Sequence, residues 1–363
     1  MENLDRLRKE IDAVDERMTA LFEQRMALVR DVVAYKTAHG LSIADPSREE
    51  DVIRRNVARI ADRDIRDYYV SFQQEVMQLS RDWQRRLSKG LKVAYSGVPG
   101  AFAYIAAGRL YPGAERLSCA GFEEAYRACE RGEADVAVLP FENSSVGEVS
   151  AVADLMFSGS LYVNQVIEVE VEQNLLGLPG ADKSKIRKVF SHPQALSQCA
   201  DYIHENGMEA IGLSNTAAAA KQVAEMQDPA CAAIGTAEAA ALYGLEILVP
   251  RVNSSRMNTT RFAAFSRMLR LDTENKGKMG KHFMLMYTVK NEAGALAQTL
   301  NIIGAHNFNM CNLRSRPMKE LLWNYYFFVE LDGDVATDEG SSLLQELAPL
   351  CDRLKLVGSF CTR

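Results

Sequence analysis

The chain has 363 residues, of which 47% are hydrophobic and 25% are charged, a composition typical of a globular protein with two or three domains. A formal net charge of −6, without a basic stripe interleaved with aromatic residues, argues against nucleic acid as a partner. The seven cysteines include no CxxC pair, no apolar run is long enough to cross a membrane, and the N-terminus MENLDRLRKE has no apolar signal core. We therefore expect a cytoplasmic protein with reduced thiols, without a metal site and without a membrane partner.

The first helix is predicted from Leu4 to Gly40, and apolar residues recur along it in steps of three and four. These seam residues are Leu7, Ile11, Val14, Met18, Leu21, Leu28 and Val32. Two cations, Arg25 and Lys36, occupy positions in the same seam. Because whole turns separate them, they share one face about 16 Å apart and can bracket a small anion. The alternative is that each cation extends to solvent or pairs with a partner carboxylate.

Two further helices complete an all-helical domain over residues 1–89. Asp45 is a favourable N-cap and Pro46 is tolerated at the first helical position, so the second helix is expected to begin there. A third helix is predicted over about residues 64–89, and Ser80 and Gln84 project from it side by side. Because a helix as long as the first cannot bury its own seam, the pattern also predicts an intertwined dimer.

Strand-like and helix-like segments alternate over residues 91–267, which predicts an α/β domain with mostly parallel strands and ligands at their carboxyl ends. Neither a dinucleotide fingerprint nor GxxxxGK occurs, so we expect no nucleotide site and no cofactor. A polar run, NSSRMNTTRF at 253–262, lies between apolar strand-like segments. Buried there without partners, each polar group would cost about 1–3 kcal/mol, so the run is expected to face a cleft. The alternative is a polar turn with hydroxyl caps.

Within this run, Thr260 and Arg261 are adjacent, so their side chains point to opposite faces of an extended strand. One of them can contact a ligand directly while the other supports it from behind.

After a polar linker over residues 267–281, the pattern is strand, helix (293–304), strand, strand (LLWNYYFFVEL), helix (339–347), strand. This order is the split βαβ plan of an α+β domain over residues 281–363.

Four segments carry a family resemblance. YSGVPGAFAYIAA at 95–107, PFENSSVGEV at 140–149, SHPQAL at 191–196 and NTTRF, in this order, resemble the prephenate dehydratase family over about half of the chain. The first 89 residues resemble the helical chorismate mutases, whose binding positions are matched by Arg8, Arg25, Lys36, Asp45, Arg48, Glu49, Ser80 and Gln84. Residues 281–363 resemble the regulatory ACT module, which has a ferredoxin-like fold. The chain as a whole resembles the bifunctional chorismate mutase/prephenate dehydratases, and the resemblance implies a two-lobed central domain like the periplasmic binding proteins.

For the helical domain, the resemblance implies a rearrangement of chorismate to prephenate that needs no nucleophile, only positioning and charge stabilisation. Arginines would hold the substrate carboxylates, Lys36 and Gln84 would donate to the ether oxygen as it becomes negative, and Glu49 would accept from the ring hydroxyl. Arg8 lies about 25 Å along the helix from Arg25, too far for both to hold one small molecule. We therefore expect Arg8 to serve the site of a partner chain.

For the central domain, the resemblance implies that Thr260 is the catalytic threonine of prephenate dehydration, which releases CO2 and water. The other expected contacts are Glu142, Asn143 and Ser144 on an opposing wall, with Ser191, Gln194, Arg261 and Phe262. Because His192 is followed by Pro193, this segment is as consistent with a cap at the start of a helix as with polar contacts to the substrate. The chain departs from the family at Ala101 and Ala103, where a hydroxyl pair is common, so substrate contact from that loop is in doubt.

For the C-terminal module, Gly294-Ala295-Leu296 matches a phenylalanine-binding motif, although a glycine at a helix start is also ordinary capping. The usual second motif, Glu-Ser-Arg-Pro, is replaced by Arg314-Ser315-Arg316-Pro317. A cation near the ammonium of an amino acid would weaken feedback by phenylalanine. The competing interpretation is that Arg314 points to solvent and has no effect.

The resulting prediction is a homo-oligomeric enzyme, at least a dimer, that makes phenylpyruvate from chorismate by way of prephenate, without a cofactor. One alternative within the enzyme class is arogenate dehydratase. An alternative from another class is a non-catalytic sensor of amino acids or aromatic acids, against which Thr260 and the matched mutase positions argue.

Overall fold

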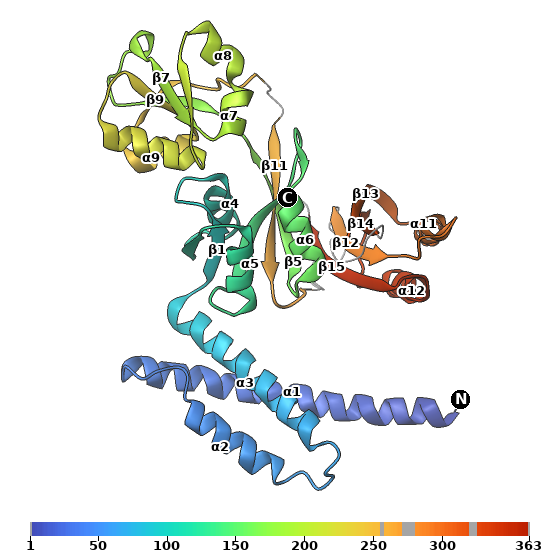
Figure 1. The fold of residues 1–363 in the computed structure, drawn as a ribbon. Helices are drawn as coiled ribbons and strands as arrows, with labels where there is room; N and C mark the ends of the chain where they lie inside the picture. Colours follow the sequence, from blue (N-terminus) through green and yellow to red (C-terminus); the bar gives the residue numbers. More distant parts are fainter. Residues whose placement is uncertain (1, 255–257, 271–279, 319–324, 362–363) are drawn as a thin grey trace. The chain divides into compact units, whose positions relative to one another are not determined.

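The computed structural model describes residues 2–254, 258–270, 280–318 and 325–361, and it divides into two compact units, Met1–Lys92 and Val93–Arg363 (Figure 1). Three segments lie outside the described residues: 255–257 of the polar run, 271–279 of the predicted linker, and 319–324, which include the first residues of the predicted strand LLWNYYFFVEL.

The first unit is all-helical, as the sequence predicted. It consists of α1 (Glu2–Ala38), α2 (Pro46–Val57) and α3 (Arg66–Lys89). Asp45 caps α2, because its Oδ1 accepts a hydrogen bond from the Arg48 backbone N–H at 3.1 Å. Gly90 ends α3 with a φ of 76°, a left-handed conformation that glycine adopts without strain. None of the helices in the described residues is both long enough and apolar enough to span a membrane.

The apolar surface of α1 is divided between two faces. Within the chain, α3 packs on the face that carries Val29 and Val33, which are buried. The predicted seam lies beside this face and stays exposed in the single chain, including Ile11 at 59% and Leu28 at 59%. The sequence analysis placed Leu28 and Val32 in one seam with Arg25. In the structure, α3 covers the adjacent face of α1, which carries Val29 and Val33, and leaves Leu28 and Val32 exposed. Within the described part of the helical unit, the seam of α1 is therefore left uncovered.

The second unit contains two sheets. The larger sheet has the strand order β13-β14-β12-β15-β5-β11-β3-β1-β2, with β4 paired to β3, and the smaller one has the order β10-β6-β9-β7-β8 (Figure 1). The strands of the larger sheet are β1 (Lys92–Ser96), β2 (Glu115–Cys119), β3 (Val136–Asn143), β4 (Gly147–Glu148), β5 (Tyr162–Glu170), β11 (Thr259–Ser266), β12 (Lys281–Thr288), β13 (Asn309–Pro317), β14 (Tyr325–Asp332) and β15 (Arg353–Cys361). The strands of the smaller sheet are β6 (Asn174–Gly177), β7 (Lys188–Ser191), β8 (Glu209–Gly212), β9 (Cys231–Gly235) and β10 (Glu246–Val249).

Helices flank both sheets. They are α4 (Phe102–Leu110), α5 (Phe122–Glu130), α6 (Ser150–Ser158), α7 (Pro193–Gln198), α8 (Ala200–Glu205), α9 (Thr216–Met226), α10 (Ala237–Tyr243), α11 (Ala295–Ala305) and α12 (Asp338–Leu347), with short 3-10 turns η1 (Lys183–Lys185) and η3 (Ala348–Leu350). The α/β alternation is confirmed, but the expectation of mostly parallel strands is only partly right. β1 and β3 are parallel, as are β7, β8 and β9, whereas β11 is antiparallel to both β3 and β5. The reason is that β11 carries the chain back from the smaller sheet into the larger one.

A β-bulge interrupts the pairing of β3 with β11 at Phe141. Arg261 pairs with Glu142 but Phe262 pairs with Pro140, so Phe141 has no partner of its own on β11. Phe141 packs into the core instead, which lets Pro140 and Asn143 face the same side although they are three residues apart. The bulge therefore sets which side chains of this segment can reach a ligand.

The last part of the chain has the predicted split βαβ order, with strands arranged β13-β14-β12-β15. One face of these strands packs against α11 and α12 through a core that contains Phe283, Leu285 and Ile303. The opposite face, with Met284 and Phe328, joins the core around α6. The strands of this C-terminal module are thus part of the larger sheet, which they join where β15 pairs with β5.

Candidate functional sites

The first candidate site lies between α1 and α3. The Arg25 guanidinium donates a hydrogen bond to the Ser80 hydroxyl, and Ser80 is only 4% exposed. Burial lowers the pKa of Arg25 from its ordinary value. Gln84, one turn further along α3, is also buried, and its Oε1 has no hydrogen-bond partner among the residues that the structure describes. A buried polar group of this kind is costly, so it indicates that a ligand group completes the site.

Lys36 borders a cavity of about 570 Å³. Its Nζ donates to the Ile43 carbonyl at 2.6 Å, and Arg81 and Arg85 of α3 line the same cavity. The sequence analysis did not identify these two arginines. Their spacing of four residues places both side chains on one face of the helix, which could have indicated a shared anion-binding position. Glu49 does not border the cavity, because its carboxylate is paired with Arg81. The cations around this cavity suit a small molecule with more than one carboxylate.

The remaining predicted mutase residues lie apart from this cluster. Arg48 is exposed, and Asp45 serves α2 as its cap. The Arg8 side chain is 68% exposed and lies 3.7 Å from Asp5. Within one chain, the structure joins Arg25 to Ser80, with Gln84 one turn further along α3, and places Lys36 with Arg81 and Arg85 at the cavity. Arg8 lies in neither group.

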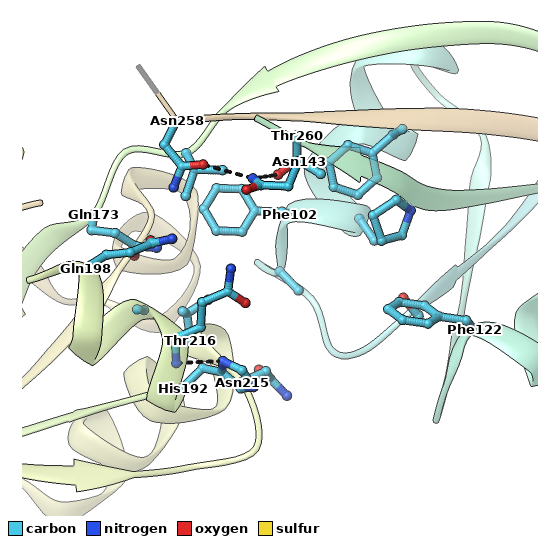
Figure 2. A pocket seen from close by; sticks show the side chains of 18 residues that line it. Phe102, Phe122, Asn143, Gln173, His192, Gln198, Asn215, Thr216, Asn258 and Thr260 are labelled. Carbon is cyan, nitrogen blue, oxygen red and sulfur yellow. Dashed lines mark hydrogen bonds between the residues drawn. The ribbon is translucent and has the colours of Figure 1, made fainter. Parts of the chain in front are cut away.

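The second candidate site is a pocket of about 260 Å³ in the second unit, lined by residues of both sheets (Figure 2). On one wall, the Asn143 Nδ2 donates to the Thr260 Oγ1 at 2.9 Å and to the Asn258 Oδ1 at 2.8 Å. The Asn143 Oδ1 accepts from the backbone N–H of Ser145 at 2.9 Å and of Val146 at 3.0 Å, which fixes the amide. Because Asn143 donates to Thr260, the hydroxyl hydrogen of Thr260 is left for another acceptor.

Arg261 and Glu142 face away from this pocket. The Arg261 guanidinium lies 2.8 Å from the Glu142 Oε2 and binds both oxygens of Glu330, at 2.7 and 2.8 Å. Burial alone would lower the pKa of Arg261, but the two carboxylates raise it above its ordinary value. The predicted split between Thr260 and Arg261 is confirmed. Glu142 was expected on the opposing wall, but it is adjacent to Asn143 on β3 and so points to the opposite face, where it pairs with Arg261.

The other predicted residues of this region divide in the same way. Phe262 and Gln194 line the pocket, with Ala101 and Ala103 from the departing loop. Ser144 lies outside the lining, and its Oγ accepts from the Thr259 backbone N–H at 2.9 Å. Ser191 is buried and donates to the Ile234 carbonyl at 2.7 Å, which is a structural role. His192 both caps α7 and lines the pocket. Its Nδ1 accepts a hydrogen bond from the Gln194 backbone N–H at 3.2 Å, and its side chain is part of the pocket lining.

The pocket lining contains neither lysine nor arginine among the residues that the structure describes, so a bound anion needs another source of positive potential. Helix N-termini supply it. The first residues of α4 (Phe102), α5 (Phe122) and α9 (Thr216) all line the pocket. Neither α4 nor α5 has a side-chain cap within the described part of the chain, and the N-terminal end of a helix carries partial positive charge. Glu123 and Glu124 offset part of this charge in the first turn of α5.

A set of amides on the far wall was not predicted from the sequence. Gln173, Gln198 and Asn215 reach the pocket from the smaller sheet and its connections (Figure 2). Gln173 is 2% exposed, and its Oε1 has no hydrogen-bond partner among the described residues. Nothing in the local sequence of these residues marks them, because they come together only when the chain crosses between the two sheets.

Arg314 takes neither of the orientations considered from the sequence. Its side chain is 24% exposed and is paired with Glu142, and its Nη1 lies 3.9 Å from Glu148. Arg316 is paired with Glu148 at 2.5 Å on the same face of β13. Gly294 is the N-cap of α11 with a φ of 86°, and Leu296 packs in the core on the opposite face of the sheet. Arg314 therefore tethers the C-terminal module to β3 and β4 and does not face Leu296.

Comparisons with known proteins match a different family model in each unit. Residues 7–85 match the family model for chorismate mutase type II, and residues 93–269 match the model for prephenate dehydratase. The bifunctional chorismate mutase/prephenate dehydratase of Escherichia coli K12 is 28% identical over 369 residues, covering 98% of this chain and 95% of its own. Arogenate dehydratase 1 of Petunia hybrida is 32% identical over 287 residues, covering 74% of this chain and 66% of its own.

Among solved structures, the prephenate dehydratase from Arthrobacter aurescens in complex with L-Phe has a TM-score of 0.68 at 26% identity, covering 75% of this chain and 90% of its own. The two family models together span the helical unit and the pocket-bearing part of the second unit, and the bifunctional relatives align along nearly the whole length. This chain belongs to the bifunctional chorismate mutase/prephenate dehydratase family.

Proposed function

We propose that this chain converts chorismate to prephenate in the helical unit and prephenate to phenylpyruvate, CO2 and water in the pocket of the second unit, as steps of phenylalanine biosynthesis. The observation that carries the second activity is the Thr260 hydroxyl, held at 2.9 Å by Asn143 on the wall of a pocket onto which helix N-termini open. The two family matches support the pair of activities. The test is the conversion of chorismate to phenylpyruvate by the purified full-length chain.

In the mutase step, the C–O bond of the ether breaks while a C–C bond forms, and negative charge builds on the ether oxygen. Lys36 and the Gln84 amide are the donors proposed for that oxygen, and Arg25 holds a substrate carboxylate with Ser80 behind it. No group of the protein needs to bond covalently to the substrate. The protein therefore accelerates the step by holding the reactive conformer and by stabilising charge.

In the dehydratase step, the ring carboxylate leaves as CO2, its bonding electrons enter the ring, and the ring hydroxyl leaves as water after it receives a proton. The proton donor we propose is Thr260, whose acidity is raised by the hydrogen bond from Asn143. Aromatisation of the ring drives the reaction. The N-termini of α4, α5 and α9 are the proposed binding positions for the substrate carboxylates.

Arogenate dehydration is the second candidate activity. Arogenate carries an ammonium where prephenate carries a ketone, and the Gln173 Oε1 offers an acceptor without a partner inside the pocket. The Petunia relative also bears the name arogenate dehydratase. Comparing kcat/KM for prephenate and arogenate on the same preparation decides between the two substrates.

We propose that the enzyme is at least a homodimer in the cytoplasm. The apolar seam of α1 is exposed in one chain, and Arg8 lies on this helix away from the rest of the mutase cluster. A second copy of α1 would cover the seam and bring its Arg8 to the neighbouring site.

The exchange of Arg8 between chains has a direct test. Arg8→Ala and Lys36→Ala proteins are each expected to lose mutase activity, and mixing them under conditions that allow dimers to exchange should restore part of it, because one site of each mixed dimer is intact. Mass spectrometry of differently labelled chains confirms that mixed dimers have formed. If mixed dimers form and mutase activity stays absent, Arg8 acts within its own chain or not at all.

We also propose that residues 91–267 form the dehydratase domain and that residues 281–363 form an ACT module that responds to phenylalanine. The structural support is the split βαβ order and the ion pairs from Arg314 and Arg316 to Glu142 and Glu148. Glu142 lies next to Asn143, so a movement of β13 is transmitted to the wall that holds Thr260. The solved relative in complex with L-Phe is consistent with an amino-acid effector.

Arg314→Glu is expected to lower the free energy of unfolding by about 2–4 kcal/mol, because it places a third carboxylate beside Glu142 and Glu148. Phenylalanine inhibition of the dehydratase should become weaker in this variant, since the tether to β3 is lost. Lys290→Glu is the matched control, because it makes the same charge change at an exposed position of the same module. Denaturant unfolding and inhibition curves provide the two measurements. Unchanged stability with tighter inhibition would instead favour the view that Arg314 repels the ligand ammonium.

A further inference from the structure

The C-terminal module carries a group of metal-binding residue types that neither proposed activity uses. His282 of β12, Cys311 of β13 and Asp332 of β14 come from three neighbouring strands, and one potential ligand atom of each lies within 4.8 Å of the others. His282 and Asp332 are direct cross-strand partners, so their side chains leave the same face of the sheet. On β13, Asn309 is the cross-strand partner of Asp332, and Cys311, two residues further along, points to the same face and contacts Asp332.

The distances between these atoms suit a single ion. The His282 Nδ1 lies 3.1 Å from the Asp332 Oδ1 and 3.9 Å from the Cys311 Sγ, and the Cys311 Sγ lies 2.8 Å from the Asp332 Oδ1. With the usual bond lengths of about 2.0–2.3 Å, the ligand atoms of a tetrahedral zinc ion lie about 3.3–3.6 Å apart. Small rotations of the Cys311 and Asp332 side chains therefore reach that geometry without movement of the strands.

The surroundings hold two of the three side chains in place. The Asn309 Nδ2 donates to the Asp332 Oδ2 at 2.8 Å, which leaves the Oδ1 directed at His282 and Cys311. The His282 ring stacks on Phe360 with an angle of 10° between the ring planes. Glu330 is near as well, with its Oε1 3.6 Å from the His282 Nδ1, but both of its oxygens are already bound by Arg261. Asp332 is 44% exposed and Cys311 is exposed, so a fourth position is open to water.

We propose that His282, Cys311 and Asp332 form a binding site for a borderline-soft divalent cation of the zinc class, with a solvent ligand at the fourth position. One thiolate, one imidazole and one carboxylate favour Zn²⁺ or Co²⁺ over Mg²⁺ and Ca²⁺, which prefer oxygen ligands alone. A bound ion joins β12, β13 and β14, the strands that carry Arg314 and Glu330. The site would thus stabilise the part of the module that contacts β3 and β11.

The experiment uses the full-length chain after treatment with a chelator, with Zn²⁺ and Co²⁺ as probes. Titration with Zn²⁺ in a calorimeter should give one ion per chain, Co²⁺ should produce the near-ultraviolet charge-transfer band of a cobalt thiolate, and Zn²⁺ should raise the Tm. Mg²⁺ should do none of these. In Cys311→Ser the cobalt thiolate band should disappear, and the Zn²⁺ affinity of Cys311→Ser and of His282→Asn should fall by at least about tenfold.

Cys361→Ser is the matched control, because it removes a thiol from the same sheet that is not part of the group. It should keep the cobalt band, the affinity and the rise in Tm. The proposal is overturned if the parent chain gives no thiolate band, or if Cys311→Ser keeps it, or if Cys361→Ser loses it equally. Far-ultraviolet circular dichroism establishes that each variant is folded, so loss of the site is distinguished from loss of the structure.

Discussion

Replacing Thr260 by valine is expected to lower kcat of the dehydratase by about 10²- to 10³-fold and to leave the mutase rate unchanged. Valine keeps the shape of the side chain but removes the hydroxyl that accepts from Asn143 at 2.9 Å and that we propose donates to the leaving oxygen. The pocket wall otherwise remains, because Asn143 keeps its bonds to Asn258 and to the backbone of Ser145 and Val146. KM for prephenate should therefore change much less than kcat.

The neighbouring threonine provides the control for this experiment. Thr259 does not line the pocket, and its backbone pairing is independent of its side chain. Thr259→Val should retain dehydratase activity, and Thr260→Ser should retain more than Thr260→Val, since serine keeps a hydroxyl at the same place. Assays with prephenate and with chorismate, on protein shown to be folded, separate the two activities. Equal activity of Thr260→Val and Thr259→Val would rule out Thr260 as the proton donor.

Replacing Lys36 by alanine should reduce the mutase rate by about a hundredfold or more, since it removes a donor to the ether oxygen in the transition state. Gln84→Ala should have an effect of similar size, because the buried Gln84 amide is the second donor that we propose for the ether oxygen. Dehydratase activity measured with prephenate should be unaffected in both variants.

Arg30 lies on the same helix as Lys36 and is exposed, so Arg30→Ala tests for a general effect of removing a cation from α1. Its mutase rate should stay within about twofold of the parent chain, as for most surface substitutions. If a single substitution in a folded variant removes both activities, the two sites are not independent, and the assignment of one reaction to each unit is wrong.

The periodic parts of the fold were predictable because they depend on local patterns. The three N-terminal helices, the cap at Asp45 and the split βαβ order of the C-terminal module follow from residue spacing and were confirmed. The opposite directions of Thr260 and Arg261 follow from the geometry of an extended strand and were also confirmed. These features require no knowledge of which segments meet in space.

The features that were missed depend on tertiary structure. Glu142 was expected in the pocket together with Asn143 and Ser144, but neighbouring residues of a strand point to opposite faces, so Asn143 contacts Thr260 while Glu142 pairs with Arg261. Gln173 enters the pocket because the chain crosses there between two sheets. The ion pairs of Arg314 with Glu142 join residues far apart in sequence, so a motif comparison alone placed its charge beside a ligand.

The most direct test of the central claim is the ultraviolet absorbance of a solution of chorismate after addition of the purified full-length chain, without added metal or cofactor. The account predicts that chorismate disappears and that phenylpyruvate forms, with Thr260→Val stopping the sequence at prephenate and Lys36→Ala slowing the first step. Persistence of chorismate, together with no consumption of prephenate when it is supplied directly, would contradict the account and would favour a chain that senses such molecules without converting them.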